Sequence, residues 1–254
     1  MQLDNDPDSL AYIIKENPML DALLQSILDD YKRTTSMFIH ELRNPLTLMK
    51  GTLQYIETKH PEAKDFKYWE QLQDLVHDME VMMSDASQLN TSNSITKANH
   101  NLLILIGNSV NHFMPQAAEQ QVDLSMECED HCEEYFYTYS CDALKLKQVF
   151  FNLLKNALEA TVPGNFIHVT LKYLPGDGQS LPKLSIRFSN NGQPIPADEV
   201  EKIFVPFVTY KKGGTGVGLA IARKIIELHY GTISVTSDES LTSFTILLPY
   251  NILN

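Results

Sequence analysis

An apolar repeat of helical spacing fills much of the first ninety residues and limits what the chain can fold into. Apolar residues recur every three to four positions from Met19 to Ile56, which predicts one long amphipathic helix. The stretch KHPEAKD interrupts this repeat, and a second one runs from Phe66 to Leu89. Two amphipathic segments joined by a short break predict a helical hairpin.

A two-helix hairpin leaves its apolar seam in water unless something covers it. Two hairpins that associate into a four-helix bundle bury the seam, so the pattern predicts a homodimer. Packing of the hairpin on its own C-terminal part is the alternative. In the first helix we expect Phe38, Leu42, Leu46 and Met49 to point into the seam.

The pattern changes after about residue 98, where helical and strand-like segments alternate. Helices are expected over 102–120, 142–160 and 217–229, and strands at VDLSMEC, YFYTY, FIHVTLKYL and LPKLSIRFS. GTISVTS and LTSFTILLP read as a closing β-hairpin. The fold class is therefore α+β, a helical hairpin followed by an α/β sandwich. The expected division is an N-terminal segment 1–18, a hairpin domain 19–95 and a sandwich domain 96–254.

Charge and composition exclude several classes of protein. The formal net charge is -12, so a general basic surface for nucleic acid or anionic lipid is not expected. No window approaches the roughly 20 apolar residues of a membrane helix, and the acidic start MQLDNDPDSL is unlike a secretory signal. We expect a cytoplasmic protein without a membrane span. The three cysteines, Cys128, Cys132 and Cys141, are expected to be free thiols, because metal-ligand spacing is lacking.

One histidine lies in a chemically suggestive sequence, FIHELRNPLT. On a helix His40 lies about 200° from Phe38, so its ring is expected to face solvent. A carboxylate at Glu41 could fix the tautomer of the ring and make the other nitrogen more nucleophilic. Asn44 follows on the same face as His40. Taken alone, a surface histidine beside a glutamate is usually inert.

Two further motifs lie in the C-terminal part. Asn152, Lys155, Asn156 and Glu159 form a polar stripe on an otherwise apolar helix, which is either a solvated face or a set of ligands for Mg²⁺ and polyphosphate. The loop GGTGVGL opens a helix whose first free N–H groups could hold phosphate oxygens. Each motif is weak evidence by itself.

Together the motifs resemble a known family. HELRNP, QVFFNLLKNALEA, NNGQPIP, IFVPFVTYK and GTGVGLAIARKI occur in the order found in two-component sensor histidine kinases. The resemblance covers about residues 19 to 250 and implies a dimerisation and phosphoacceptor hairpin followed by a Bergerat-type ATP-binding domain.

The resemblance also implies roles for individual residues. His40 matches the phosphoacceptor, Glu41 its acidic partner, and Asn44 the position that orients a water for dephosphorylation of the partner regulator. Asn152 and Asn156 match the asparagines that bind Mg²⁺-ATP. The remaining positions implied in nucleotide binding are Lys155, Asn190, Gly192, Lys211, Gly214, Thr215, Gly216, Gly218 and Leu219.

Two positions depart from the family pattern. Asn190 stands where the family has its adenine-reading Asp, and Pro194 replaces a glycine. A neutral amide makes a weaker bond to the adenine amino group than a carboxylate does, so we expect weakened rather than lost nucleotide affinity.

The resemblance implies a function for the chain as a whole. It would autophosphorylate on His40 and pass the phosphoryl group to an aspartate of a response regulator receiver domain, and it could also dephosphorylate that partner. Because residues 1 to 18 are too few for a sensor domain, a separate sensor protein is a candidate partner. The alternatives are a phosphorelay phosphotransferase or kinase-inhibiting decoy with a degenerate ATP site, and a protein that only dephosphorylates its regulator.

Overall fold

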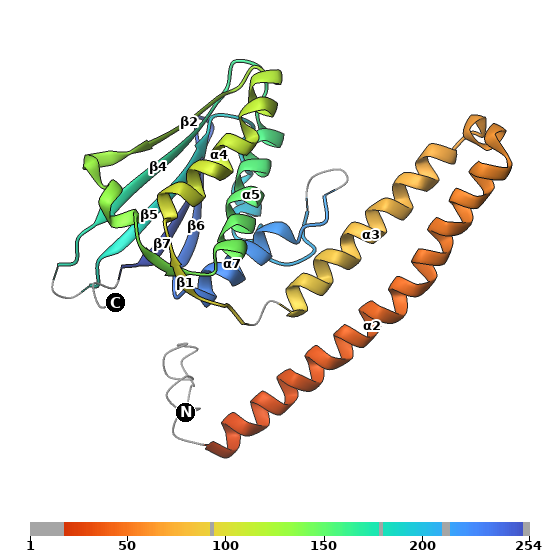
Figure 1. Ribbon diagram of the computed structural model, residues 1–254, viewed down its shortest axis with the longest axis horizontal. Helices are drawn as coiled ribbons and strands as arrows, with labels where there is room; N and C mark the ends of the chain where they lie inside the picture. The colour runs from red at the N-terminus through yellow and green to blue at the C-terminus, as the bar shows by residue number, and fades with distance from the viewer. Residues whose placement is uncertain (1–17, 92–93, 178–179, 210–213, 251–254) are drawn as a thin grey trace. The chain divides into compact units, whose positions relative to one another are not determined.

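The structure, a computed structural model, describes residues 18–91, 94–177, 180–209 and 214–250. The chain divides into two compact units, Met1–Asn90 and Thr91–Asn254, which we call the hairpin unit and the sheet unit (Figure 1). None of the described helices is both long enough and apolar enough to cross a membrane.

The hairpin unit consists of two long helices, as the apolar repeats predict. Helix α2 spans Pro18–Lys59, the short 3-10 helix η1 spans Pro61–Asp65, and α3 spans Trp69–Thr91. Polar contacts cross between the two long helices. Lys50 Nζ lies 2.7 Å from Glu80 Oε2, and Gln73 Nε2 donates to Glu57 Oε2 at 2.7 Å.

The apolar surface of α2 is wider than the hairpin itself can cover. Ile39 and Leu46, seven residues apart, are buried. The side chains of Phe38, Leu42 and Met49 are 60%, 56% and 47% exposed, although the sequence pattern predicted that they point inward with Leu46. These three form a second stripe beside the one that Ile39 and Leu46 occupy, and the single chain leaves it uncovered. Their place in a seam between two hairpins therefore stays a prediction.

The sheet unit is an α/β sandwich, which confirms the predicted fold class. Its five-stranded sheet has the order β2-β4-β5-β7-β6, with β2 parallel to β4 and the other neighbours antiparallel. Helices α4, α5 and α7 cover one face of the sheet (Figure 1). A short pair of strands, β1 and β3, lies apart from it. The bounds are β1 Ala98–His100, α4 Leu102–Glu119, β2 Asp123–Cys128, η2 Glu129–His131, η3 Glu133–Phe136, β3 Tyr139–Cys141, α5 Ala143–Ala160, β4 Phe166–Leu174, β5 Lys183–Asn190, α6 Ala197–Val200, α7 Gly218–Leu228, β6 Thr232–Ser237 and β7 Thr242–Pro249.

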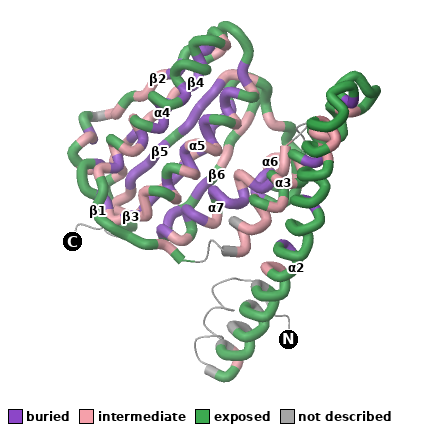
Figure 2. Tube along the Cα trace, turned by 45° about the vertical axis from the view of Figure 1, so that its right-hand side comes forward, coloured by how far each residue is buried: buried purple, intermediate pink, exposed green. Residues whose placement is uncertain are grey.

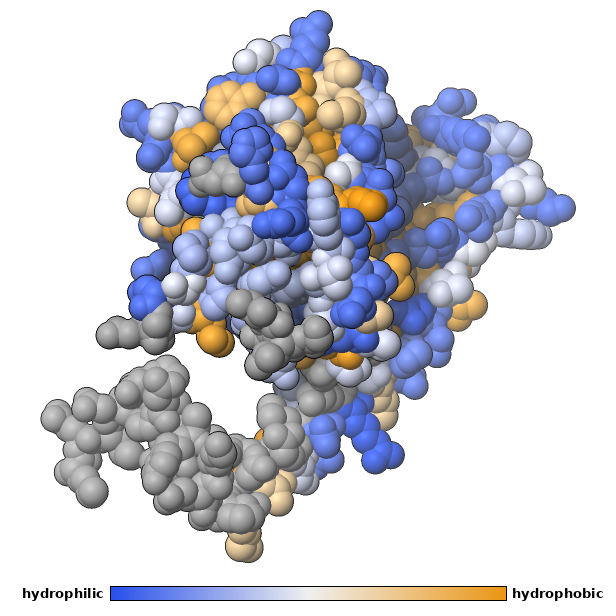
Figure 3. All heavy atoms as spheres, turned by 60° about the vertical axis from the view of Figure 1, so that its left-hand side comes forward, coloured by the Kyte–Doolittle hydropathy of each residue, from blue (hydrophilic) through white to orange (hydrophobic). Residues whose placement is uncertain are grey.

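Alternating residues of the central strands build the core against the helices. Leu184, Ile186 and Phe188 of β5 are buried, and each faces an apolar partner on β7 in register. The ring of Phe188 stacks on that of Phe150 from α5, with 6.0 Å between centroids. Figure 2 shows this buried layer running through the strands and the sheet-facing sides of the helices. The outer surface in Figure 3 is mainly hydrophilic, with apolar side chains in small separate patches.

The segment YFYTY does not form the strand that its composition predicted. Residues Glu133–Phe136 form the 3-10 helix η3, and the strand begins only at Tyr139. The turn places neighbouring rings in different surroundings: Phe136 is fully buried, while Tyr135 stacks on Tyr173 at 3.7 Å between centroids. Burial of Phe136 and stacking of Tyr135 on Tyr173 outweigh the β-propensity of the segment.

The expectation of three free thiols is also wrong. Cys128 and Cys132 form a disulfide, because η2 turns the chain back between them and brings their Cα atoms to 6.0 Å. His131 within that turn has a φ of 52°, a conformation that sequence spacing does not reveal. Cys141 is free and buried, and burial raises the pKa of its thiol to about 11.

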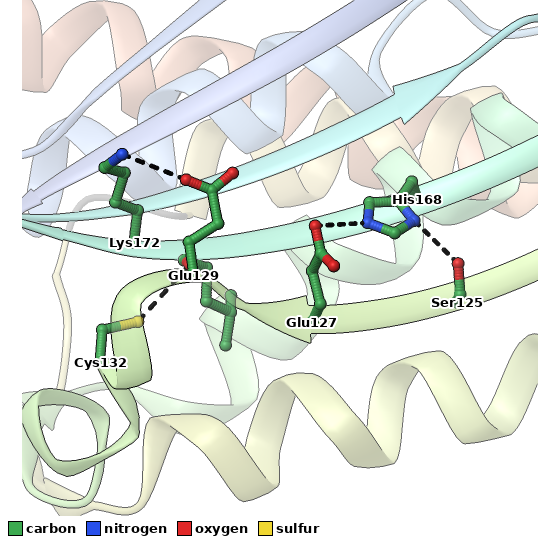
Figure 4. A network of polar contacts seen from close by, with 7 residues as sticks. Ser125, Glu127, Glu129, Cys132, His168 and Lys172 are labelled. Atoms are coloured by element: carbon green, nitrogen blue, oxygen red, sulfur yellow. Dashed lines mark hydrogen bonds and ion pairs between the residues drawn. The ribbon is translucent and has the colours of Figure 1, made fainter.

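A polar network fixes the edge strand β2 to β4 on the face that the helices leave open (Figure 4). His168 contacts Ser125 Oγ through Nδ1 at 2.8 Å and Glu127 Oε1 through Nε2 at 2.9 Å. Further along, Lys172 Nζ lies 3.1 Å from Glu129 Oε2. Ser125 and His168 are direct partners in the parallel register, so the network holds these two strands in register.

Candidate nucleotide site

At one end of the sheet the buried apolar rows become polar. Asn190 continues the row of Leu184, Ile186 and Phe188 on β5, and its register partner on β7 is Thr242. Thr242 in turn is paired with Ser237 of β6. Three neighbouring strands therefore end in an amide and two hydroxyls on the helix-facing side, which is the composition of a binding site rather than of a core.

Hydrogen bonds organise this polar end. Ser237 Oγ accepts from the backbone N–H of Ile195 at 2.9 Å and lies 2.7 Å from Thr242 Oγ1. The loop that follows β5 is thereby tied to the β6–β7 hairpin. The sequence analysis missed Ser237 and Thr242; the signal available was the alternation Thr242-Phe244-Ile246-Leu248, which ends in a polar residue.

Asn190 is the most unusual residue of this group. Its side chain is only 3% exposed, and among the described residues its Nδ2 has no hydrogen-bond partner. Gly192 lies beside it: a Cβ added there would come within 3.1 Å of Asn190 Nδ2 and 2.2 Å of the Ala160 carbonyl oxygen. A glycine at this position is therefore required for the loop to pack on the end of α5.

Helix α5 brings the predicted asparagines to α7. Asn152 Nδ2 donates to the Gly218 carbonyl oxygen at 2.9 Å, and a Cβ on Gly218 would lie 3.5 Å from the Asn152 side chain. Asn156 is half-buried one turn further along. Lys155 and Glu159 are exposed and lie 3.9 Å apart, so they form the solvated edge of the stripe.

The glycine-rich segment leads directly into α7. Gly216 has a φ of +68°, and a Cβ there would meet the Val208 carbonyl oxygen at 2.5 Å, so only glycine suits the position. The helix begins at Gly218 after the N-cap Val217, which makes no side-chain cap hydrogen bond. Its first backbone N–H groups are thus left for other acceptors, with the positive end of the helix dipole behind them. Gly214, Thr215 and Leu219 are half-buried around this start, and the predicted Lys211 lies outside the described residues.

His229 holds the end of α7 against the start of α5. Its Nδ1–H donates to the Ile225 carbonyl oxygen at 2.8 Å, and its Nε2 accepts from the Asp142 N–H at 3.0 Å. Asp142 is also the N-cap of α5, where its carboxylate accepts from the N–H groups of Lys145 and Thr96. Burial lowers the pKa of His229, so the neutral ring is the form that this joint requires.

The candidate phosphoacceptor lies in the hairpin unit. His40, Glu41 and Asn44 are all exposed on α2. Within the described residues no hydrogen bond joins the His40 ring to Glu41. The His40 ring is therefore accessible to a reaction partner. His40 and Asn44, four residues apart, lie on the same face of α2.

The donor set of the sheet unit is compatible with Mg²⁺ bound together with phosphate. Since the Asn152 Nδ2 is committed to Gly218, its amide oxygen is the atom left to act as an oxygen ligand. In the part of the chain that the structure describes, no cluster of His, Cys, Asp and Glu could hold a metal alone. Mg²⁺ in such a site takes one or two protein ligands and completes its shell with substrate phosphates and water.

The fold and this site define a class of ATPase. Residues 141–252 match the family described as histidine kinase-, DNA gyrase B-, and HSP90-like ATPase. This range contains the asparagine helix, the polar end of the sheet and the glycine-rich start of α7.

Individual relatives narrow the class. The catalytic domain of histidine kinase ThkA is 32% identical, with a TM-score of 0.53, and the match covers 61% of this chain and 96% of that one. The structure of ThkA in complex with the response regulator protein TrrA matches with 25% identity, a TM-score of 0.61 and coverage of 98% of this chain and 68% of that one. The sensor histidine kinase ZraS of Escherichia coli is 32% identical over 225 residues, 84% of this chain and 44% of that protein.

The chain belongs to the histidine kinase family. It spans less than half the length of the curated relatives that it matches, 44% of ZraS and 27% of sporulation kinase E of Bacillus subtilis.

Proposed function

We propose that this chain is the kinase core of a two-component system. It binds ATP and Mg²⁺ in the sheet unit, phosphorylates His40, and transfers the phosphoryl group to an aspartate of a response regulator. The observation that carries the proposal is the meeting of Asn152 with the start of α7, because it brings an amide oxygen ligand next to uncapped helix N–H groups.

The chemistry follows from these groups. A ring nitrogen of His40 attacks the γ-phosphorus, the bond from that phosphorus to the β–γ bridging oxygen breaks, and ADP leaves. Glu41 takes the ring proton as the histidine becomes phosphorylated. Asn152 and Asn156 would hold Mg²⁺ through their amide oxygens, and the bound ion would supply positive charge to the phosphates. The glycine-rich segment and the N-terminus of α7 stabilise the charge of the transferred group, and Lys155 adds positive charge. The family resemblance assigns Lys211 a similar role.

The partners follow from the surfaces and the relatives. The ThkA–TrrA complex supports a response regulator as the receiver of the phosphoryl group. The exposed stripe of Phe38, Leu42 and Met49 supports a homodimer, because a second hairpin would cover it. We assign Asn44, four residues after His40 on α2, to orienting a water that hydrolyses the aspartyl phosphate of the regulator, as the family resemblance implies.

The test is labelling of the purified chain with γ-labelled ATP and Mg²⁺. We expect an acid-labile, base-stable label that is lost in His40→Ala. His77→Ala is the matched control, because His77 is also an exposed histidine of the hairpin unit. Retention of the label by His40→Ala would show that the phosphoacceptor is elsewhere. ATP binding without any label in the wild type would favour a decoy or phosphotransferase.

A further inference from the structure

The buried amide of Asn190 has a donor with no acceptor. Its Nδ2 is fully covered and unpartnered among the described residues, and it faces the Gly192 backbone, where no side chain can reach it. A buried donor without an acceptor lowers the stability of the fold, because it has lost its bond to water. Half a turn of the amide exchanges Nδ2 with Oδ1, so a ligand that offers an acceptor on the Oδ1 side would recover that loss.

An amide and a carboxylate differ in which hydrogen bonds they can form with the group at position 6 of a purine. An ionised carboxylate only accepts hydrogen bonds, so it accepts from the 6-amino group of adenine and opposes the 6-carbonyl of guanine or hypoxanthine. An amide carries an acceptor and a donor on one plane, and half a turn about its last bond exchanges them. Asn190 can therefore accept from a 6-amino group or donate to a 6-oxo group.

The neighbours of Asn190 do not provide a selection between 6-amino and 6-oxo purines either. Across the end of the sheet it is flanked by Ile167 on β4 and Thr242 on β7, followed by Ser237 on β6. Hydroxyls donate or accept as their partner requires, and no charged side chain belongs to this row. The polar end of the sheet is thus neutral and can adapt at every position.

We propose that this chain binds 6-oxopurine nucleotides as well as adenine nucleotides, with Asn190 as the residue that removes the discrimination. The inference rests on the proposed nucleotide site and extends its substrate class. Sites that hydrogen-bond a substrate group through fixed polar atoms reject analogues that leave those atoms unpaired. An amide free to rotate leaves neither partner unpaired.

The test compares ADP with IDP, which differ at purine position 6 and its adjacent N1 proton, by calorimetry on the full chain with Mg²⁺. Neither diphosphate carries a γ-phosphoryl group, so the readout is binding alone. For the wild type we expect dissociation constants within about tenfold of each other. In Asn190→Asp the preference for ADP should widen by at least about tenfold, through tighter ADP and weaker IDP.

Asn191→Asp is the matched control. It makes the same change of charge one residue away, and the Asn191 Oδ1 acceptor of the Phe166 N–H, at 2.7 Å, is retained by a carboxylate. The control should keep the wild-type ratio.

Two results would overturn the inference. A wild-type preference for ADP above about tenfold would contradict it, and the wild-type ratio decides this even if Asn190→Asp fails to fold. A folded Asn190→Asp with an unchanged ratio would show that another group reads position 6. A wild type that binds neither nucleotide would instead remove the nucleotide site itself, and the inference with it.

Discussion

The two units of the chain bury their apolar side chains to very different extents. In the described part of the hairpin unit the buried apolar residues are Ile39, Leu46, Ala63 and Val76. The sheet unit buries whole rows of its strands and the facing sides of three helices (Figure 2). The sheet unit therefore completes its core from one chain.

The hairpin unit instead displays large apolar side chains along both helices. Leu72, Leu75, Met79 and Met82 of α3 are exposed, as are Phe38, Leu42 and Met49 of α2. Exposed apolar side chains that recur along both helices are typical of surfaces that bind another protein. The comparison teaches that one chain completes the polar end of the sheet, whereas it leaves apolar side chains of α2 and α3 uncovered, and the proposed dimer would cover them.

The largest effect is expected in the core of the sheet unit. Phe188 is 1% exposed and stacks on Phe150. Phe188→Ala should lower the free energy of unfolding by about 3–5 kcal/mol, through lost burial and the cavity left behind. Chemical denaturation at two protein concentrations measures it, and the loss should not depend on concentration. A loss below 1 kcal/mol would mean that the sheet unit is not the self-sufficient part.

The second prediction concerns the exposed apolar stripe of α2, where the effect of a substitution should depend on protein concentration. Leu42 is 56% exposed in the single chain, so Leu42→Glu should leave an isolated hairpin intact yet weaken dimerisation by about thirtyfold or more, ~2 kcal/mol. Sedimentation equilibrium measures the shift. Leu48→Glu is the control: Leu48 is 72% exposed and lies about 120° around α2 from Leu42. Equal effects of the two variants would argue against a specific dimer surface.

Sequence reasoning located the elements better than their contacts. The helical repeat and the order of the motifs predicted the hairpin, the asparagine helix and the glycine-rich start of α7. The repeat could not tell which of two adjacent stripes faces α3, because Phe38 and Ile39 belong to one continuous apolar surface. That choice depends on how the second helix packs, which a single period does not encode.

The candidate site shows the same limit. Asn152 and Gly218 were recognisable from their motifs, but Thr242 and Ser237 become neighbours of Asn190 only through strand register. The turn between Cys128 and Cys132 contains His131 at a positive φ, a local conformation that cysteine spacing does not encode. Strand register and the burial of Phe136 at YFYTY are tertiary effects that override local propensity.

A smaller effect tests the joint between α5 and α7 by pH. Burial lowers the pKa of His229, with Lys97 and Lys145 acting in the same direction against Asp142 and the Ile225 carbonyl oxygen. The folded state therefore resists protonation more than the unfolded state does. The contribution of the neutral His229 ring to the free energy of unfolding is fully present above the pKa of histidine in the unfolded chain, near 6.5. This contribution falls as the pH drops below that value, by at most ~1.4 kcal/mol per pH unit.

Denaturation of the wild type and His229→Gln between pH 7.5 and 5.5 measures this dependence. The glutamine variant should be less stable at pH 7.5 but flatter with pH in this window. The sheet unit would then be acid-sensitive at a single buried joint. Parallel slopes for the two proteins would assign the acid sensitivity to other groups.

The smallest effect concerns the polar contacts within the hairpin. Lys50 and Glu80 join α2 to α3 at 2.7 Å, but the two side chains remain 46% and 31% exposed. Exposed ion pairs of this kind contribute about 0.2–1 kcal/mol and are screened by salt. Lys50→Ala should therefore cost no more than that in low salt and almost nothing in 0.5 M salt, measured by thermal denaturation. If it destabilised the hairpin as much as Leu42→Glu, polar contacts within one chain would be holding the unit together. The exposed apolar stripe would then not require a second copy to cover it.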